Sequence, residues 1–338
     1  MEADIYQRIQ GGLAEKRQNL ADFLDSASEE KKDLCCQDEH EIHDHLQVIE
    51  TSLEKVEDEI LGICTVCHEH VDPGLLEMDY TSHVCLDHYS GSERRQLEEE
   101  LRLSQVVQRA LLPQDFPAIP GVELAAFTRP AAIVSGDYFD FFNFRDGTHG
   151  LIIADVPGHG VSAGMLMSSL QTAIRTMAPE TDSLSEVLAR LNRFYIHNIH
   201  FTTFVTIFLA RFDPLTLRLT YTNAGHNPPA VVHKRMAEVS WLKPNTSAIG
   251  LVEDFHPRAE SLTFEHGDIL FMYTDGVTEA FNPALEQFGT QRLGELLRKN
   301  ADLGANHIIQ TVRRGLEAFG NGQEFEDDTT FVTLKLLE

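Results

Sequence analysis

The sequence has few basic residues and no long apolar run. Its 338 residues carry 27 Lys and Arg against 53 Asp and Glu, which gives a formal net charge of -26. Binding to nucleic-acid phosphates needs clustered Lys and Arg, so this charge argues against a nucleic-acid partner. No apolar stretch approaches the ~18 residues of a membrane span, and residues 1–4 are acidic rather than the start of a secretory signal. We therefore expect a cytoplasmic protein without a membrane partner.

Cysteine is also scarce, with five residues, three of which lie between positions 64 and 85. This content fits a reducing compartment better than a disulfide framework. Cys64, Cys67, Cys85 and His88 follow the spacing C-x2-C-x17-C-x2-H, two close pairs of ligands joined by a loop. The spacing predicts a tetrahedral Zn²⁺ site with a structural role, because four protein ligands leave no open position.

Other histidines and cysteines near this motif stay open. His68, His70 and His83 are close enough in sequence to compete as zinc ligands. Cys35 and Cys36 have no obvious partner in the sequence, and we leave these two thiols unassigned.

The sequence divides into four segments by composition and periodicity. Apolar residues at helical spacing predict helices over 3–30 and 41–61, joined by the polar stretch 31–40 as a helical hairpin. A segment rich in Cys and His follows, and then an amphipathic stretch that Pro113 ends. We expect a helical hairpin at 1–62, a zinc finger at 63–91, a linker helix at 92–113 and a larger domain at 114–338.

Residues 1–90 resemble the TraR/DksA family, on the helix end at 56–60 followed by the first zinc ligand at 62–64. His88 stands where that family commonly has a fourth cysteine. Members act on RNA polymerase through the tip of the hairpin. The resemblance therefore implies an alternative function, a transcription regulator that contacts RNA polymerase.

The larger domain mixes strands and helices. Apolar runs predict buried strands at 150–154, 204–210, 269–273 and 331–336. Alternating apolar and polar residues predict a half-buried strand at 217–222. Helical periodicity predicts helices at 161–177, 184–198, 289–299 and 305–319. Ser183 and Glu186 have the spacing of a capping box at the start of the second helix.

Four aspartates lie at separate turns, and three of them directly follow or lead into a short apolar, strand-like run: Asp137, Asp155, Asp275 and Asp327. Acidic residues at the ends of buried strands build rigid, oxygen-rich pockets for divalent cations. Two such ions ~3.5–4 Å apart offset the repulsion between a phosphate monoester and its nucleophile. The pattern predicts metal-assisted phosphoryl hydrolysis.

Residues 122–338 resemble the SpoIIE/RsbU-like branch of the PPM-type metal-dependent serine/threonine phosphatases. The matching motifs occur in order: Leu111-Leu112-Pro113-Gln114, Ser135-Gly136-Asp137-Tyr138-Phe139-Asp140, Ala154-Asp155-Val156-Pro157-Gly158-His159-Gly160-Val161, Asn223-Ala224-Gly225-His226-Asn227-Pro228-Pro229, Tyr273-Thr274-Asp275-Gly276-Val277-Thr278-Glu279-Ala280 and Asp327-Asp328-Thr329-Thr330. The resemblance implies an α+β fold, a sandwich of two β-sheets flanked by helices, and an active enzyme.

The resemblance also implies the ligands of two or more Mn²⁺ or Mg²⁺ ions. Asp155 would bridge two ions, and the backbone carbonyl of Val156 would add a ligand. Asp275 and Asp327 would complete one ion, while Asp137 would serve the other, mostly through water. Asp155 and Asp275 are the residues on which catalysis would depend most.

Residues beside these ligands have less certain roles. Asp328 stays open as an alternative to Asp327, and Asp140 is expected to support the site rather than bind metal. His159 could protonate a leaving oxygen or shape its loop by a hydrogen bond. His226 is expected to be a structural turn residue.

Two positions depart from the family pattern. Ser135 stands where glycine is usual, and Pro157 stands where serine is common, which removes one N–H from the loop after Asp155. The carboxylates themselves are all present, so an inactive scaffold is disfavoured.

Taken together, the sequence predicts a bacterial protein-serine/threonine phosphatase, and the N-terminal zinc module would regulate or localise it. The family's usual substrates imply a phosphorylated anti-anti-sigma factor and partner-switching control of transcription. The apolar positions of the linker helix fit a homodimer.

Overall fold

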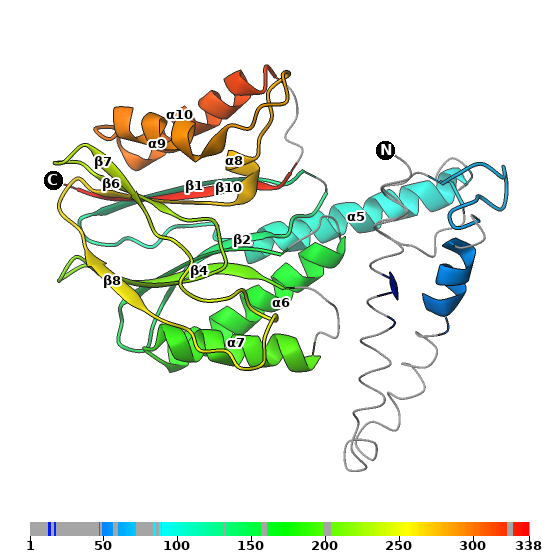
Figure 1. Cartoon of the computed structure of the whole chain (residues 1–338), viewed down its shortest axis with the longest axis horizontal. Helices are drawn as coiled ribbons and strands as arrows, with labels where there is room; N and C mark the ends of the chain where they lie inside the picture. The colour runs from blue at the N-terminus through cyan, green and yellow to red at the C-terminus, as the bar shows by residue number, and fades with distance from the viewer. Residues whose placement is uncertain are drawn as a thin grey trace, which may run out of the picture. The chain divides into compact units, whose positions relative to one another are not determined.

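The computed structural model describes part of the N-terminal half and most of the rest of the chain. The described residues are 13, 14, 17, 47, 49–56, 60–71, 84, 85, 88, 90–131, 133–156, 161–198, 204–322 and 327–337. The chain forms two compact units, residues 1–101 with 199–202, and residues 102–198 with 203–338. Figure 1 shows the elements of both.

Two antiparallel sheets form the second unit, which we call the catalytic unit. One sheet has the order β1-β10-β9-β6-β7, and the other has the order β2-β3-β4-β5-β8. The strands are β1 (Val122–Arg129), β2 (Asp137–Asn143), β3 (His149–Asp155), β4 (Thr206–Asp213), β5 (Arg218–Ala224), β6 (Ala230–His233), β7 (Glu238–Trp241), β8 (Glu260–Thr263), β9 (Ile269–Tyr273) and β10 (Thr329–Leu336). The predicted buried and half-buried strands lie within or across β3, β4, β5, β9 and β10.

The two sheets face each other across an apolar core. Phe139, Ile153 and Phe208 from one sheet pack in the same cluster as Leu270 and Val332 from the other. Side chains alternate between the faces of a strand, so a strand that is apolar throughout has a buried layer on each side. All residues of β9 and β10 are buried, which fits a second apolar layer behind the first sheet.

Helices supply the outer layers. The helix pair α9 (Gly289–Lys299) and α10 (Ala305–Phe319) covers the outer face of the first sheet, with Leu293, Ile308 and Val312 against Phe271 and Phe331. On the other sheet lie α6 (Val161–Met177), the short 3-10 helix Ala178–Glu180 and α7 (Leu184–Asn198). The result is a helix–sheet–sheet–helix sandwich, visible from top to bottom at the left of Figure 1. The bounds of all four α-helices agree with the predicted ones.

The start of α7 differs from the predicted capping box. Ser183 Oγ accepts a hydrogen bond from Glu186 N at 3.2 Å, as predicted. The Glu186 carboxylate does not return to Ser183 but accepts from the Thr181 hydroxyl at 2.7 Å and pairs with Arg190. Both partners lie beside it, and a charged partner gives the stronger bond. The reciprocal half of the capping box was therefore a wrong prediction.

Within the first unit, residues 13, 14, 17, 47 and 49–56 are helical, and Leu13 and Ile49 are buried. Residues 60 and 61 are not helical, so the second predicted helix does not reach its predicted end at 61. The remainder of the hairpin, including Cys35 and Cys36, lies outside the described residues. The helix α5 (Gly91–Leu111) lies where the sequence predicts the linker helix.

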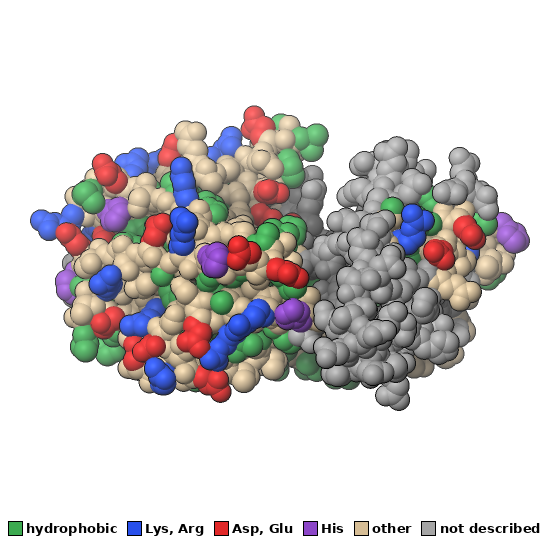
Figure 2. All heavy atoms as spheres, turned by 60° about the horizontal axis from the view of Figure 1, so that its bottom comes forward, with side chains coloured by type: hydrophobic (Ala, Val, Ile, Leu, Met, Phe, Trp, Pro, Cys, Tyr) green, Lys and Arg blue, Asp and Glu red, His purple; other side chains and the backbone are tan. Residues whose placement is uncertain are grey.

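The surface of the described residues carries mixed charge. Figure 2 shows acidic and basic side chains interspersed over one face of the catalytic unit. Among the residues that the structure describes, no helix is long and apolar enough to cross a membrane.

A buried ion pair joins α6 to β2. Asp140 is 1% exposed and accepts from Arg175 Nε and Nη2, both at 2.5 Å, and from the Tyr138 hydroxyl at 2.7 Å. Its carboxylate oxygens are thus fully occupied by partners within the fold. The expected supporting role of Asp140 agrees with this geometry.

We predict that Asp140→Asn destabilises the catalytic unit by about 2 kcal/mol, less than the roughly 3–5 kcal/mol for breaking a fully buried pair, because Arg175 reaches solvent. Urea unfolding followed by Trp241 fluorescence reports this unit, since Trp241 is the sole tryptophan. Asp182→Asn, which breaks an exposed pair with Arg145, is the control. Equal midpoints for both variants would contradict the prediction.

Candidate active site

The predicted metal-binding aspartates come from the ends of two strand pairs, one in each sheet. Asp137 begins β2 and Asp155 ends β3, and the antiparallel register places them directly opposite each other. Asp275 begins the short helix α8 (Asp275–Thr278) after β9, and Asp327 lies just before β10. In the other sheet, β9 and β10 pair with Tyr273 opposite Phe331. Asp275 and Asp327, which flank this pair, therefore also lie at one end of their sheet.

Thr274 connects the two sheets at this point. The residue is fully buried, and its hydroxyl donates to Asp137 Oδ2 at 2.8 Å. The Thr274 hydroxyl oxygen also accepts a hydrogen bond from Thr330 N at 3.0 Å, which fixes Thr274 at the start of β10. Thr274 therefore holds a side chain of one sheet at the strand ends of the other. Sequence reasoning did not assign it a role, since a threonine beside an aspartate is common.

One oxygen of Asp137 is left for another partner. Asp137 is 2% exposed, and its Oδ1 has no hydrogen-bond partner among the described residues. A buried carboxylate oxygen without a partner is costly unless a cation or water takes that place. This oxygen fits a metal ion or a metal-bound water.

Asp327 and Asp328 differ in what they contact. Asp328 is 4% exposed, and its two carboxylate oxygens accept from Ala131 N at 2.8 Å and Gly136 N at 2.7 Å. This carboxylate anchors the loop that leads to Asp137. Asp327 is exposed, and its Oδ1 accepts from the N–H of Asp328 at 2.8 Å. The geometry therefore favours Asp327 over Asp328 as a ligand.

The carboxylates repel one another. Burial, followed by Asp275, Asp327 and Asp328, raises the pKa of Asp155 to about 7. Burial, followed by Asp327 and Glu279, raises the pKa of Asp275 to about 6.

Burial and the charge of Asp155 likewise raise the pKa of Asp137 well above its usual range. A bound divalent cation would reverse these shifts, because it supplies the positive charge that the aspartates lack. The donor set is thus the kind that hard cations such as Mg²⁺ and Mn²⁺ prefer.

Gly276 allows the two strand ends to approach. A Cβ atom at this position would lie 2.2 Å from the carbonyl oxygen of Asp328 and 2.9 Å from Thr329 Oγ1. The backbone of α8 therefore packs directly against the start of β10. This contact brings Asp275 beside Asp327 and requires glycine.

The C-terminal part of α5 contacts the loop before Asp137. Gln108 is 7% exposed, and its Nε2 donates to Ser135 O at 2.7 Å while its Oε1 accepts from Ser135 N at 2.9 Å. Ser135 Oγ in turn accepts from Asp137 N at 3.0 Å. The serine that replaces the usual glycine thus holds the start of β2. No sequence signal identified Gln108, which is one polar residue on an amphipathic helix.

Other predicted residues have the following places. Val156 is buried, and its N–H donates to Gly136 O at 3.3 Å, so its loop begins next to Asp137. Pro157 and His159 lie outside the described residues. His226 is fully buried in the turn after β5, which agrees with the predicted structural role.

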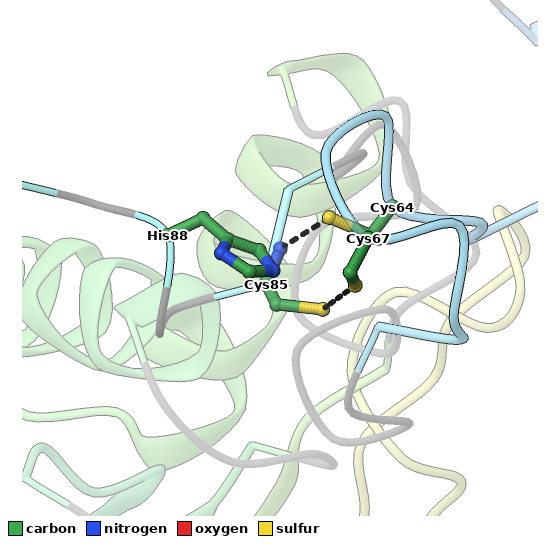
Figure 3. A group of neighbouring side chains, drawn as sticks. All are labelled: Cys64, Cys67, Cys85 and His88. Carbon is green, nitrogen blue, oxygen red and sulfur yellow. Dashed lines mark hydrogen bonds between the residues drawn. The ribbon is translucent and has the colours of Figure 1, made fainter.

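The predicted zinc ligands meet in the first unit. The ligand atoms of Cys64, Cys67, Cys85 and His88 all lie within 4.8 Å of one another. Figure 3 shows the three sulfurs and the imidazole turned toward a common centre. Two of the sulfurs, those of Cys67 and Cys85, lie 3.8 Å apart.

A tight turn presents the first pair of these ligands. Cys64 N donates to Glu69 O, and His68 N donates to Cys64 O, with His68 at φ 60°. Burial raises the pKa of the Cys64 thiol, but backbone N–H groups, among them those of Cys85 and Val66, outweigh it and lower the pKa to about 6. The thiolate is the zinc-binding form. The group could therefore hold zinc.

Comparison with known proteins agrees with this fold and site. Residues 145–337 match the family described as Stage II sporulation protein E (SpoIIE). The chain is 29% identical to Protein IcfG of Synechocystis over 70% of its length, and 27% identical to the phosphoserine phosphatase RsbU of Bacillus subtilis over 72%. It spans 41% of IcfG and 71% of RsbU.

A solved structure shares the architecture. The SiaA-PP2C domain of Pseudomonas aeruginosa superposes with a TM-score of 0.64 at 19% identity, over 73% of this chain and all of that domain. The two sheets and their flanking helices therefore have the fold of the PPM-type serine/threonine phosphatases. The family match covers more than half of the chain, so the protein belongs to the SpoIIE family. The predicted α+β sandwich and the predicted family are confirmed.

Proposed function

We propose that the protein is a Mn²⁺- or Mg²⁺-dependent phosphatase that hydrolyses phosphoserine or phosphothreonine on a regulatory protein. The observation that carries the proposal is the pairing of Asp137 with Asp155, close enough to Asp275 and Asp327 for their charges to act on Asp155, together with a buried Asp137 oxygen that has no protein partner among the described residues. Membership of a family that contains phosphoserine phosphatases supports it.

The assigned ligands are those that the sequence predicted. Asp155 would bridge two ions, Val156 would contribute its carbonyl, and Asp275 and Asp327 would complete one ion, with Asp137 serving the other. Bound ions of this kind offset the charge of a phosphoryl group and lower the pKa of a water nucleophile. The chain positions these groups through Thr274, which holds Asp137.

The remaining anchors act on the backbone. Asp328 holds the loop at 131–136, and Gly276 lets α8 approach β10. Each anchor is buried, so the ligand oxygens are placed before any substrate arrives. Such preorganisation reduces the reorganisation needed when charge develops on the phosphoryl oxygens.

The substrate is part of the proposal. A phosphorylated anti-anti-sigma factor in a partner-switching pathway fits the similarity to RsbU, whose name describes it as a phosphoserine phosphatase. The alternative, contact with RNA polymerase through the N-terminal hairpin, stays a prediction, since the tip of that hairpin lies outside the described residues. A cytoplasmic, reducing setting belongs to the same proposal, because Cys64, Cys67 and Cys85 are the proposed zinc ligands and do not form disulfides.

We also propose that the protein forms a homodimer through α5. Leu103, Val106 and Val107 are 63%, 57% and 54% exposed on this helix. They lie three and four residues apart, so they share one face. Exposed apolar residues at this spacing are typical of a helix that pairs with another helix.

For the phosphatase, we predict that Asp155→Asn lowers turnover at least 100-fold, because a charged ligand at the centre of the cluster is lost. Phosphate release from a phosphoserine peptide at saturating Mn²⁺ measures this. Asp302→Asn, a change on the surface beside Lys234, should keep normal turnover. Near-normal turnover in Asp155→Asn would disprove the assignment.

For the zinc group, we predict one Zn²⁺ per chain that survives mild chelation and is lost in Cys64→Ser. Zinc binding contributes on the order of 10 kcal/mol to the folding of small fingers. Elemental analysis of the purified full chain gives the stoichiometry. His68→Gln, next to the ligands but outside the group, should retain zinc; folded wild-type protein without zinc contradicts the prediction.

For the dimer, we predict that the triple variant Leu103→Glu, Val106→Glu, Val107→Glu is monomeric, because like charges on the apolar face oppose pairing. Light scattering of the full chain gives the mass. Arg102→Glu reverses a charge on the same helix and should remain dimeric. A wild-type protein with the mass of one chain would rule out this interface.

A further inference from the structure

The last turn of α5 carries a buried amide that belongs to the catalytic unit. Gln108 is 7% exposed, whereas its neighbours Val106 and Val107 are more than half exposed. The catalytic unit begins at residue 102, so Gln108 lies within it. A glutamine side chain loses rotamer freedom when it is buried, and specific contacts have to offset that loss.

Both polar ends of this amide bind the backbone of one residue. Gln108 Nε2 donates to Ser135 O at 2.7 Å, and Gln108 Oε1 accepts from Ser135 N at 2.9 Å. An amide side chain carries a donor and an acceptor side by side, which matches the N–H and C=O of a residue. These two groups belong to successive peptide units, so the side chain fixes both units at once.

The helix α6 confines the amide from one side. A Cβ atom on Gly164 would lie 3.0 Å from Gln108 Nε2 and 3.2 Å from Val134 Cβ. Glycine at this position therefore lets α6 pack closely against both the amide and the residue before Ser135. The amide has no space to turn away from Ser135 on this side.

The held segment leads directly to a proposed metal ligand. Ser135 Oγ accepts from Asp137 N at 3.0 Å. The intervening Gly136 donates its N–H to Asp328 Oδ2 at 2.7 Å, and its carbonyl accepts from Val156 N at 3.3 Å. The backbone from Ser135 to Asp137 is thus held by α5, by the residue before β10 and by the residue after β3.

The position of one ligand oxygen depends on this backbone. The Thr274 hydroxyl holds Asp137 Oδ2 at 2.8 Å, while the buried Oδ1 has no partner among the described residues. With Oδ2 fixed, a shift of the Asp137 backbone turns the carboxylate about that contact. Such a turn moves Oδ1 away from the place that a cation would take.

We propose that Gln108 is a positioning residue, which clamps Ser135 and thereby aims Asp137 Oδ1 at the metal ion. The proposal rests on the proposed function, because this oxygen has a role only if the site binds metal. Groups that orient metal ligands contribute about 10–100-fold to metal affinity or activity. The last turn of α5 is therefore a part of the metal site and not only a linker.

Substitutions of Gln108 and Ser135 separate the contacts. Gln108→Met keeps the length of the side chain and removes both hydrogen bonds. Gln108→Glu keeps the acceptor for Ser135 N but turns an oxygen toward Ser135 O. Ser135→Gly loses only the hydroxyl and keeps the backbone groups that the amide binds. Gln114→Met is the matched control, because Gln114 Nε2 also donates to two backbone carbonyls, those of Arg109 and Leu112 in the same helix.

The readout is Mn²⁺ binding by the full chain, measured by the rise in Tm with Mn²⁺ concentration, together with turnover on a phosphoserine peptide. We expect the half-saturating Mn²⁺ concentration to increase at least about tenfold in both Gln108 variants. Because the ligands themselves are intact, turnover should recover at saturating Mn²⁺. Ser135→Gly and Gln114→Met should stay close to wild type in both measurements.

Two outcomes overturn the proposal. One is half-saturation close to that of wild type in both Gln108 variants. The other is a lower Tm without Mn²⁺ and an unchanged Mn²⁺ dependence, which shows that Gln108 only packs α5 against the unit.

A further variant decides if both Gln108 variants fail to fold. Gly164→Ala removes no hydrogen-bonding group, and alanine favours a helix more than glycine does. Its Cβ displaces Gln108 Nε2, so weaker Mn²⁺ binding supports the proposal and unchanged binding overturns it. A wild type that binds Mn²⁺ without turnover refutes the phosphatase and leaves the Tm comparison to test Gln108. A wild type whose Tm does not respond to Mn²⁺ overturns both.

Discussion

Electrostatic repulsion among buried carboxylates is the constraint that the rest of the catalytic unit satisfies. Burial and the charges of three other aspartates together raise the pKa of Asp155. No flexible surface would hold such groups together, because each would turn toward water. A sandwich with two covered sheets can hold them, since the strand ends are fixed by ladders and cores far from the charges. A bound divalent cation would offset the cost of this arrangement, and metal binding would then stabilise the site as well.

The anchors of the cluster share a common logic. Thr274, Asp328 and Gly276 each join the end of one strand to a segment of another, and none of them is itself a proposed ligand. The carboxylate oxygens available to a metal ion are consequently those that do not accept hydrogen bonds from the protein. This division explains why adjacent aspartates, Asp327 and Asp328, have different surroundings despite their identical chemistry.

Long periodic elements could be predicted from the sequence, and cross-sheet contacts could not. The helices α6, α7, α9 and α10 have strong apolar periodicity and matched their predicted bounds. The short strands β6, β7 and β8 carry four residues each, too few for a pattern to stand out. The aspartates were visible because they sit in recognisable motifs.

Their partners were not visible. Gln108 and Thr274 act through residues 27 and 137 positions away in the chain. The carboxylate of Glu186 bonds to Thr181 and Arg190 instead of the predicted N–H of Ser183, because these neighbours form stronger hydrogen bonds with it. Distances of this kind follow from the folded topology rather than from any local pattern.

The contact at Gly276 has a consequence for how activity is inferred across related sequences. A chain can retain every acidic ligand and still be unable to assemble the site, because any side chain at this position would push α8 away from Asp328 and the start of β10. A survey that counts aspartates would label such a protein an enzyme. The smallest residue of the motif is therefore as informative as the charged ones when an inactive relative has to be distinguished from an active one.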